Sequence, residues 1–242
     1  MTKLTKQEQL TEGKAKMIFA TNDPQVVWIH SKNQATALNG KRKVQIDEKG
    51  YYTNQISFRL LKYLKQNGVA NHLVEQVSET DITAKKLAMI PLEVVIRNYA
   101  SGHFVTRFNV EKMLHLDPPV TEFYYKSDEL DDPMINDSQI QALHIADENQ
   151  IEFLRQTALK INQLLEVVFK KAHIKLVDFK VEFGFDQDGN IILGDEISPD
   201  NMRLVDENTD ESLDKDVFRK NLGSLTDVYK VVLSRLQTEL GE

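Results

Sequence analysis

Acidic and basic side chains alternate with apolar ones in "VDFKVEFG", residues 177–184. Successive side chains of a β-strand point to opposite faces, so Asp178, Lys180 and Glu182 share one face of a predicted strand. The valines and phenylalanines between them form the other face, which we expect to face a core. Such a strand offers two carboxylates and one ammonium group to a ligand on its polar face.

A second strand follows in "NIILGDE", and the "DG" pair at 188–189 predicts a two-residue hairpin turn between the two strands. That turn places Glu182 directly opposite Asp195, on the same face. A three-residue loop would instead shift the register by one residue and separate the two carboxylates.

Two carboxylates that face each other across a hairpin repel by roughly 3 kcal/mol at an effective dielectric near 20. A proton on one of them, a lysine between them or a divalent cation would relieve the repulsion. Carboxylates completed by phosphate oxygens are the usual ligands of Mg²⁺ in proteins, so Glu182 and Asp195 are predicted metal ligands. The alternative is a solvated hairpin face on which Lys180 pairs with Glu182.

Two further stretches carry bases beside glycines. In "EGKAK", Lys14 and Lys16 lie on one face of a predicted strand, an arrangement that suits a polyphosphate but also an ordinary edge strand. The strand in "PLEVVIRNYASG" ends near Arg97, and Ser101 and Gly102 follow in a loop. Arg97 can bind a phosphate or carboxylate with two parallel hydrogen bonds, or it is a surface arginine beside a turn.

Other polar residues are less specific. Arg203 follows the second acidic strand, where it can bind an anion or form a salt bridge with Asp200 or Asp206. The acidic stretch 126–137 has the composition of a surface loop. His103 alone is as typical of a hydrogen-bonded structural histidine as of a catalytic one.

Composition limits the class of protein. The chain has 242 residues, no cysteine and a net charge of −7, from 30 Lys and Arg against 37 Asp and Glu. This balance argues against a general nucleic-acid-binding protein, and the lack of cysteine excludes disulfides and thiolate chemistry. The N-terminal segment "MTKLTKQEQL" is polar and no apolar run is long enough to span a membrane, so we expect a cytoplasmic protein that contacts neither membrane nor nucleic acid.

Strands and helices are mixed without a regular βαβ alternation, which predicts an α+β fold with largely antiparallel sheets. The expected elements are strands at 14–20, 26–30, 72–79 and 91–99, a strand and a glycine turn within 44–54, a helix ending at Gly68, a helix capped by Asp147, and two helices within 214–240 separated at Gly223.

Taken together, several stretches resemble the SAICAR synthetase family of purine biosynthesis, in the family's order and over the whole length. The most specific are "LVDFKVEFG" and "LGDEISPDNMRL". The others are "EGKAK", "PLEVVIRNYASG", "DDPMIN" and "LDKDVFRKNLG".

The resemblance implies three regions. An N-terminal antiparallel sheet domain similar to a kinase small lobe would span 1–88, a larger ATP-binding α+β domain 89–204, and C-terminal helices packed on that domain 205–242. The implied reaction joins L-aspartate to the carboxylate of 5-amino-1-(5-phosphoribosyl)imidazole-4-carboxylate (CAIR). It gives SAICAR, ADP and phosphate, with an acyl phosphate as the expected intermediate. ATP is the co-substrate, Mg²⁺ the cofactor, and a homo-oligomer is left open.

The resemblance also implies residue roles. Lys14 and Lys16 would contact the ATP phosphates, and Met89 would lie near adenine. Lys180 and Asp178 would be catalytic, with Lys180 neutralising charge on the transferring phosphoryl group or the substrate carboxylate. Glu182 and Asp195 would hold Mg²⁺ and so contact ATP. The implied substrate-binding residues are Arg97, Ser101, His103, Lys126, Asp200 and Arg203, with Asp132 as a weaker candidate.

The sequence departs from the family pattern at two positions. His103 stands where the family usually has serine, and Gln34 stands where it commonly has an acid. Two other functions are compatible with part of the pattern: a small-molecule kinase that uses Mg-ATP, and a nucleotide-binding module without activity. Arg97 and Arg203 favour the ligase over the kinase, because a ligase must bind two additional anionic substrates.

Overall fold

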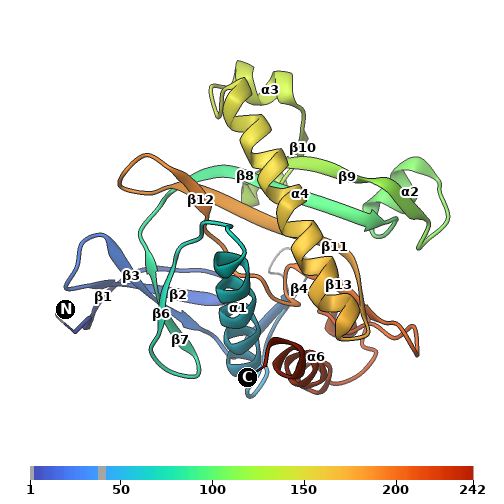
Figure 1. Ribbon diagram of the computed structural model, residues 1–242, viewed down its shortest axis with the longest axis horizontal. Helices are drawn as coiled ribbons and strands as arrows, with labels where there is room; N and C mark the ends of the chain where they lie inside the picture. The colour runs from blue at the N-terminus through green and yellow to red at the C-terminus, as the bar shows by residue number, and fades with distance from the viewer. Residues whose placement is uncertain (1–2, 38–41, 242) are drawn as a thin grey trace.

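The computed structural model describes residues 3–37 and 42–241, and it contains two larger antiparallel sheets (Figure 1). The first sheet has the strand order β1-β2-β3-β7-β6, and all of its pairings are antiparallel. Its strands are β1 (Lys6–Glu12), β2 (Lys16–Thr21), β3 (Val26–Ser31), β6 (Leu73–Gln76) and β7 (Asp81–Lys85). Helix α1 (Lys49–Gln66) packs against this sheet, and β4 (Gln34–Ala37) and β5 (Arg42–Gln45) form a separate ribbon.

The second sheet carries most of the predicted site. Its central strand β11 lies between β8 on one side and β12 and β13 on the other. The strands are β8 (Ala88–Tyr99), β9 (His115–Tyr125), β10 (Met134–Ile135), β11 (Ile174–Phe185), β12 (Ile191–Leu193) and β13 (Met202–Asp206). The α+β class with antiparallel sheets is therefore confirmed, whereas the likeness to a kinase small lobe stays a prediction.

Helix α4 (Glu148–Lys171) crosses one face of the second sheet (Figure 1) and packs against β8 and β11. Phe179, Val181 and Phe183 of β11 are buried in the same core as the apolar stripe of α4. Side chains of a strand alternate between faces, so Asp178 and Lys180 lie on the face away from α4. The apolar pattern thus fixes which face of β11 is free for chemistry.

The remaining helices are short, apart from α6 with its 16 residues. They are α2 (His103–Phe108), the 3₁₀ turn η1 (Asp128–Leu130), α3 (Asp137–Ala142), α5 (Asp216–Arg219) and α6 (Leu225–Leu240). Helix α6 packs against both α1 and α4, so the C-terminal helices contact the N-terminal region as well as the central one. The domain boundary predicted between 204 and 205 falls inside β13, and the division into domains stays a prediction.

A short segment at 70–72 connects the two sheets. The amide of Leu193 in β12 donates to the carbonyl of Ala70 (3.1 Å), and the amide of His72 donates to the carbonyl of Leu193 (2.9 Å). The carbonyl of His72 accepts from the amide of Lys85 in β7 (2.7 Å). Backbone hydrogen bonds therefore join the edge of the second sheet to the first sheet next to the predicted site.

Most of the predicted elements are present, with differences at turns. Asp147 caps α4 as predicted, because its side chain accepts from the amide of Gln150 while the Gln150 side chain accepts from the amide of Asp147. Gly223 lies between α5 and α6. The glycine turn predicted near Gly50 is wrong: Gly50 lies in the first turn of α1, where a side chain would collide with the carbonyl of Ser31.

Candidate active site

The predicted two-residue turn between β11 and β12 is wrong. Phe183 pairs with Leu193, and Gly189, with a φ of 78°, closes a three-residue loop at 187–189. Glycine adopts this left-handed conformation without steric cost, and three-residue hairpin loops commonly use it there. The register is shifted by one, so Glu182 lies opposite Gly194, whose amide donates to the Glu182 carbonyl (3.0 Å).

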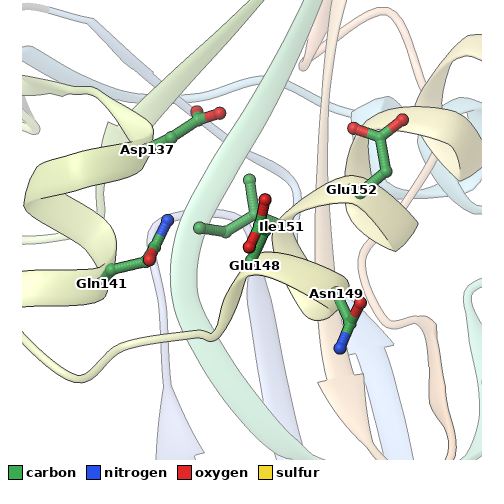
Figure 2. A pocket seen from close by; sticks show the side chains of 6 residues that line it. All are labelled: Asp137, Gln141, Glu148, Asn149, Ile151 and Glu152. Carbon is green, nitrogen blue, oxygen red and sulfur yellow. The ribbon is translucent and has the colours of Figure 1, made fainter.

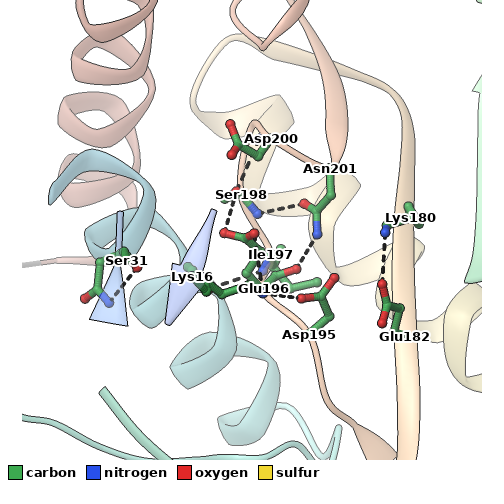
Figure 3. Close-up of polar contacts among 12 residues, drawn as sticks. Lys16, Ser31, Lys180, Glu182, Asp195, Glu196, Ile197, Ser198, Asp200 and Asn201 are labelled. Atoms are coloured by element: carbon green, nitrogen blue, oxygen red, sulfur yellow. Dashed lines mark hydrogen bonds and ion pairs between the residues drawn. The ribbon is translucent and has the colours of Figure 1, made fainter. Parts of the chain in front are cut away.

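The acid that does lie directly opposite Glu182 is Glu93 of the neighbouring strand β8. The ammonium group of Lys180 lies between the two carboxylates, 2.6 Å from Glu93 Oε1 and 2.9 Å from Glu182 Oε1. Figure 3 shows its contact with Glu182. Burial raises the pKa of Glu93, and Lys180 opposes that rise. Two carboxylates therefore do face each other on this side of the sheet, but they belong to Glu182 and Glu93 rather than to Glu182 and Asp195. Lys180 relieves their repulsion.

Asp195 follows the end of β12 and is bound by Lys16, whose Nζ lies 2.5 Å from Asp195 Oδ1. Lys126 binds the other oxygen of Glu182. Burial alone would raise the pKa of Asp195, but Lys16 and Lys180 hold it well below its usual range. We call Lys16, Glu93, Lys126, Lys180, Glu182 and Asp195 the lysine–carboxylate cluster.

Electrostatic interactions in this cluster also link residues that are not in direct contact. Burial would lower the pKa of Lys180, but Glu182 and Asp195 together raise it above its usual range. Burial would likewise lower the pKa of Lys16, but Asp195, Glu196 and Glu182 together raise it above its usual range. Glu182 and Asp195 therefore lie within electrostatic range of both lysines, although they are not directly opposed.

A second group of charges surrounds Asp178. Asp178 pairs with Arg97 of β8 on one side and with Arg203 of β13 on the other, at the same level of the sheet. Its Oδ2 atom accepts from Nη1 of Arg97 (2.7 Å) and from Nη1 of Arg203 (2.8 Å). Glu122 of β9 accepts from Nε of Arg97 (2.7 Å). We call these four residues the arginine cluster.

The loop before α2 closes over the arginine cluster. Gly102 has a φ of 55°, and a Cβ at this position would lie 2.8 Å from Nη2 of Arg203. Glycine is therefore required both by the backbone conformation and by the close approach of the guanidinium group. Ser101 is buried, and His103 is exposed as the first residue of α2.

The side chain of Asp200 is only 5% exposed, and both of its carboxylate oxygens have partners. One oxygen is bound by Lys49, which is fully buried at the start of α1, and the other accepts the hydroxyl of Tyr229 in α6 (2.6 Å). Lys49 and Lys215 hold the pKa of Asp200 well below its usual range, although burial alone would raise it. In this arrangement Asp200 ties α1 and α6 to the 198–201 loop.

The other predicted site residues have partners outside the two clusters or pack against glycines. Lys14 pairs with Asp128 (2.7 Å), and Asp132 accepts the amide of Ser127 (2.8 Å). Gln34 donates to the carbonyl of Lys14 (2.8 Å). The sulfur of Met89 lies close over Gly184 and Gly194, so Met89 covers the start of the 194–196 segment while remaining partly exposed.

Two cavities differ in their relation to these clusters. One of about 380 Å³ lies between α3 and α4, is lined by Asp137, Glu148 and Glu152 among others, and contains none of the predicted site residues (Figure 2). The other, of about 370 Å³, lies beside the arginine cluster and is lined in part by Ser101 and Arg203.

Among the described residues, no helix is both long and apolar enough to cross a membrane.

Comparison with known proteins gives a consistent result. A sequence model of the SAICAR synthetase family matches residues 9–236. The chain belongs to the SAICAR synthetase family. It is 53% identical over 234 residues to phosphoribosylaminoimidazole-succinocarboxamide synthase of Lacticaseibacillus casei strain BL23, an alignment that covers 97% of each chain.

Solved structures of SAICAR synthetases share the fold. The crystal structure of phosphoribosylaminoimidazole-succinocarboxamide synthase from Ehrlichia chaffeensis has a TM-score of 0.93 and 42% identity, covering 95% of this chain and 98% of the other. A SAICAR synthetase in complex with ADP has a TM-score of 0.92 and 40% identity, covering 97% and 98%.

Sequence reasoning missed four partners of the predicted site residues: Glu93 and Glu122 in the two clusters, and Lys49 and Tyr229 on Asp200. A signal for Glu93 is present, because it lies four residues before Arg97 in a strand and so shares its face. The apolar spacing of α6 indicates that Tyr229 is buried. The pairing of Glu122 with Arg97 depends on the register of β9, for which the sequence has no turn signal.

Proposed function

We propose that the protein catalyses the ATP-dependent joining of L-aspartate to the carboxylate of CAIR, giving SAICAR, ADP and phosphate. The observation that carries the proposal is that both clusters are centred on one face of strand β11, through Asp178 in one and through Lys180 and Glu182 in the other. Asp178 positions two arginines that suit an anionic substrate. Lys180 and Glu182 follow on the same face of the strand, among residues that suit phosphoryl transfer. The family membership and the ADP complex of a relative support the same conclusion.

Amide formation from a carboxylate requires activation, since oxide is a very poor leaving group. In the proposed sequence the carboxylate of CAIR attacks the γ-phosphorus of ATP, which forms an acyl phosphate and releases ADP. The amine of aspartate then attacks the acyl carbon, phosphate leaves with the electron pair of the C–O bond, and the amine nitrogen loses a proton. Lys180 stabilises the negative charge on the transferring phosphoryl group.

The residues of the lysine–carboxylate cluster fit a magnesium site. Among the described residues no three His, Asp or Glu side chains are arranged to hold a metal ion, so Glu182 and Asp195 would supply two oxygens and phosphate and water the others. When bound, Mg²⁺ neutralises phosphate charge. Lys16 and Lys126 bind these carboxylates in the structure, and with the metal bound they can bind phosphate oxygens instead. Lys14 can also bind phosphate once its ion pair with the exposed Asp128 breaks.

The substrates are assigned to the remaining predicted residues. Arg97 and Arg203 bind the anionic ribotide, with Ser101 and His103 at the loop beside them. Met89, the second residue of β8, contacts adenine. We assign Asp200 a positioning role, because its two oxygens are already bound by Lys49 and Tyr229. A cytoplasmic location and a homo-oligomeric state stay predictions.

The decisive experiment measures ADP release by the purified protein with Mg²⁺ and ATP. We expect release only when both L-aspartate and CAIR are present, and SAICAR in equal amount by chromatography. Release that requires CAIR but not aspartate, with a stable phosphorylated product, would favour a small-molecule kinase. Binding of ATP without release of ADP under any combination would favour a nucleotide-binding module.

A further inference from the structure

The segment 195–201 connects β12 to β13 and carries the proposed metal ligand Asp195, but it contains neither helix nor strand. A segment without a regular ladder of hydrogen bonds keeps one conformation only where other elements hold it. One such contact comes from α1, where the hydroxyl of Ser57 accepts the amide of Ile197 (3.1 Å). The position of Asp195 therefore depends on how the rest of the fold holds this segment.

Asp200 joins the segment to two helices that are far apart in the sequence. Its Oδ2 is bound by the ammonium group of Lys49 at the start of α1, and its Oδ1 accepts the hydroxyl of Tyr229 in α6 (2.6 Å). The ammonium group of Lys215 forms a longer ion pair with Oδ2 (3.7 Å). Helix α1 thus holds the segment through two side chains, and α6 holds it through a third.

The contacts of Lys49 and Tyr229 serve geometry and not ligand binding. Both residues are fully buried, so neither the ammonium group nor the hydroxyl is open to a substrate. Displacing one partner of a buried ion pair is costly, because it leaves the other charge uncompensated. The pair of Lys49 and Asp200 therefore fixes the place of Asp200 between the two helices.

Both ends of the segment contact groups of the lysine–carboxylate cluster. The carbonyl of Asn201, the neighbour of Asp200, accepts the amide of Lys180 in β11 (2.8 Å). At the other end, Oδ1 of Asp195 is bound by Lys16 (2.5 Å). A displacement of Asp200 would therefore be felt at the proposed metal ligand and at the lysine that stabilises the transferring phosphoryl group.

We propose that Lys49 and Tyr229 are positioning residues. Through Asp200 they hold the segment, and with it Asp195 and Lys180, in the arrangement that phosphoryl transfer requires. The inference rests on the proposed function and deepens it, because it assigns a role in turnover to two buried residues outside both clusters. It also makes the geometry of the site depend on the C-terminal helix α6 through one hydroxyl group.

The first test compares Tyr229→Phe and Lys49→Met with variants altered away from the segment. Tyr229→Phe removes only a hydroxyl group. Its matched control is Tyr63→Phe, because the hydroxyl of Tyr63 donates to the carbonyl of Leu164 in α4 (3.4 Å). The control for Lys49→Met is Leu165→Ala, which truncates a side chain buried in the α4 core and so lowers stability by another route.

We expect kcat to fall roughly 10- to 100-fold in Lys49→Met and about fivefold in Tyr229→Phe, because small displacements of reacting groups slow the chemistry strongly. The two controls should keep kcat within about threefold even where they lower the Tm, since lost stability reduces the amount of folded protein and not its turnover. A kcat in Tyr229→Phe equal to that in Tyr63→Phe overturns the proposal, also when Lys49→Met does not fold.

A second measurement reports on the segment without any turnover and so separates this inference from the proposed reaction. Amide hydrogen exchange is followed by NMR at Ile197 and Lys180, whose amides bond to or within the segment. Both should exchange about tenfold faster in Tyr229→Phe than in wild type or Tyr63→Phe, because the contacts that limit local opening are weaker. Equal exchange in the two variants overturns the positioning role. A wild-type protein that forms no SAICAR, with exchange changed as expected, overturns the reaction instead.

Discussion

The arginine cluster and the lysine–carboxylate cluster lie on the same face of one sheet, but they hold their charges differently. In the arginine cluster each charge comes from a strand, and Asp178 binds Arg97 and Arg203 through one oxygen atom. In the other cluster the cations are lysines on flexible stems, and Lys126 is about half exposed. Planar guanidinium groups in fixed pairs suit a permanent anion site, whereas ammonium groups can exchange one partner for another.

This difference indicates that the two clusters respond differently when ligands bind. We expect the arginine cluster to keep its geometry when a substrate binds, because Asp178 and Glu122 are both buried. We expect the lysine–carboxylate cluster to rearrange instead if phosphates and the proposed metal ion bind. Substitutions in the two clusters should therefore have different consequences for folding and for turnover.

The largest effect is expected from Asp195→Asn or Glu182→Gln. Each change removes a proposed metal ligand and should lower kcat by roughly 10³-fold, since the charge on the transferring phosphoryl group is no longer balanced. The fold should be retained, which circular dichroism can check. Turnover at the wild-type rate in either variant would contradict the metal role.

Asp178→Asn should act mainly on stability. It leaves Arg97 and Arg203 without their shared charge in a buried setting, which costs about 3 kcal/mol of unfolding free energy. Urea denaturation measures the loss, and the KM of ATP is the control, since the lysine–carboxylate cluster is intact. An Asp178→Asn variant with normal stability and a large defect only in ATP binding would contradict the separate roles of the two clusters.

Arg203→Ala should raise the KM of an acceptor substrate by about 10- to 100-fold and leave the KM of ATP nearly unchanged. The reason is that Arg203 belongs to the proposed anion site and has no contact with the phosphate-binding lysines. Steady-state kinetics with each substrate varied in turn gives the three values. An effect confined to ATP would show that the two clusters serve one ligand.

His72, which lies in the segment joining the sheets, should make stability depend on pH. Burial, and then the charge of Lys16, lower its pKa from 6.5 to about 4, while Asp195 opposes them. A lowered pKa means that the folded state binds the proton less tightly than the unfolded state, so this contribution is complete above pH 6.5 and is lost as pH falls towards 4. Between pH 7 and pH 5 the loss should be about 2 kcal/mol.

Urea denaturation of wild type and His72→Gln at both pH values isolates this contribution, because the acidic residues titrate equally in the two proteins. The difference in stability between them should shrink by the stated amount at the lower pH. A constant difference would mean that His72 is not kept neutral by its surroundings.

The smallest effect is expected from His103→Ser. His103 is exposed, and it departs from the family pattern only at the edge of the arginine cluster. Activity should change by less than about threefold, since serine can donate a similar hydrogen bond. Complete inactivation would reveal a role for His103 in the chemistry itself.

The sequence was sufficient for features that depend on local pattern. Alternation along β11 gave the core face and the polar face correctly, and the cap at Asp147 gave the start of α4. Residue types indicated that Lys180, Glu182 and Asp195 would gather. These signals are local because strand alternation and capping are set by neighbours in the chain.

The sequence was not sufficient for features that depend on register between strands. The "DG" signal favoured a two-residue turn, whereas the side chain of Asp186 accepts the amides of Asp188 and Asn190 and stabilises a three-residue loop. Glu93 and Glu122 became partners of site residues through the pairing of β8 with β11 and β9. Such pairings follow from the packing of the whole sheet, so one strand alone does not predict them.

The three-residue loop at 187–189 has a consequence for how this site can vary. Its length sets the spacing between Glu182 and Asp195, because the strand after it is displaced by one step for each residue gained or lost. A two-residue loop, with the register shifted by one, would place Asp195 directly opposite Glu182 and beside Glu93, so that three acids would crowd one face of the sheet. A surface turn thus governs how much negative charge this strand can tolerate, and both its length and the glycine at position 189 are constrained.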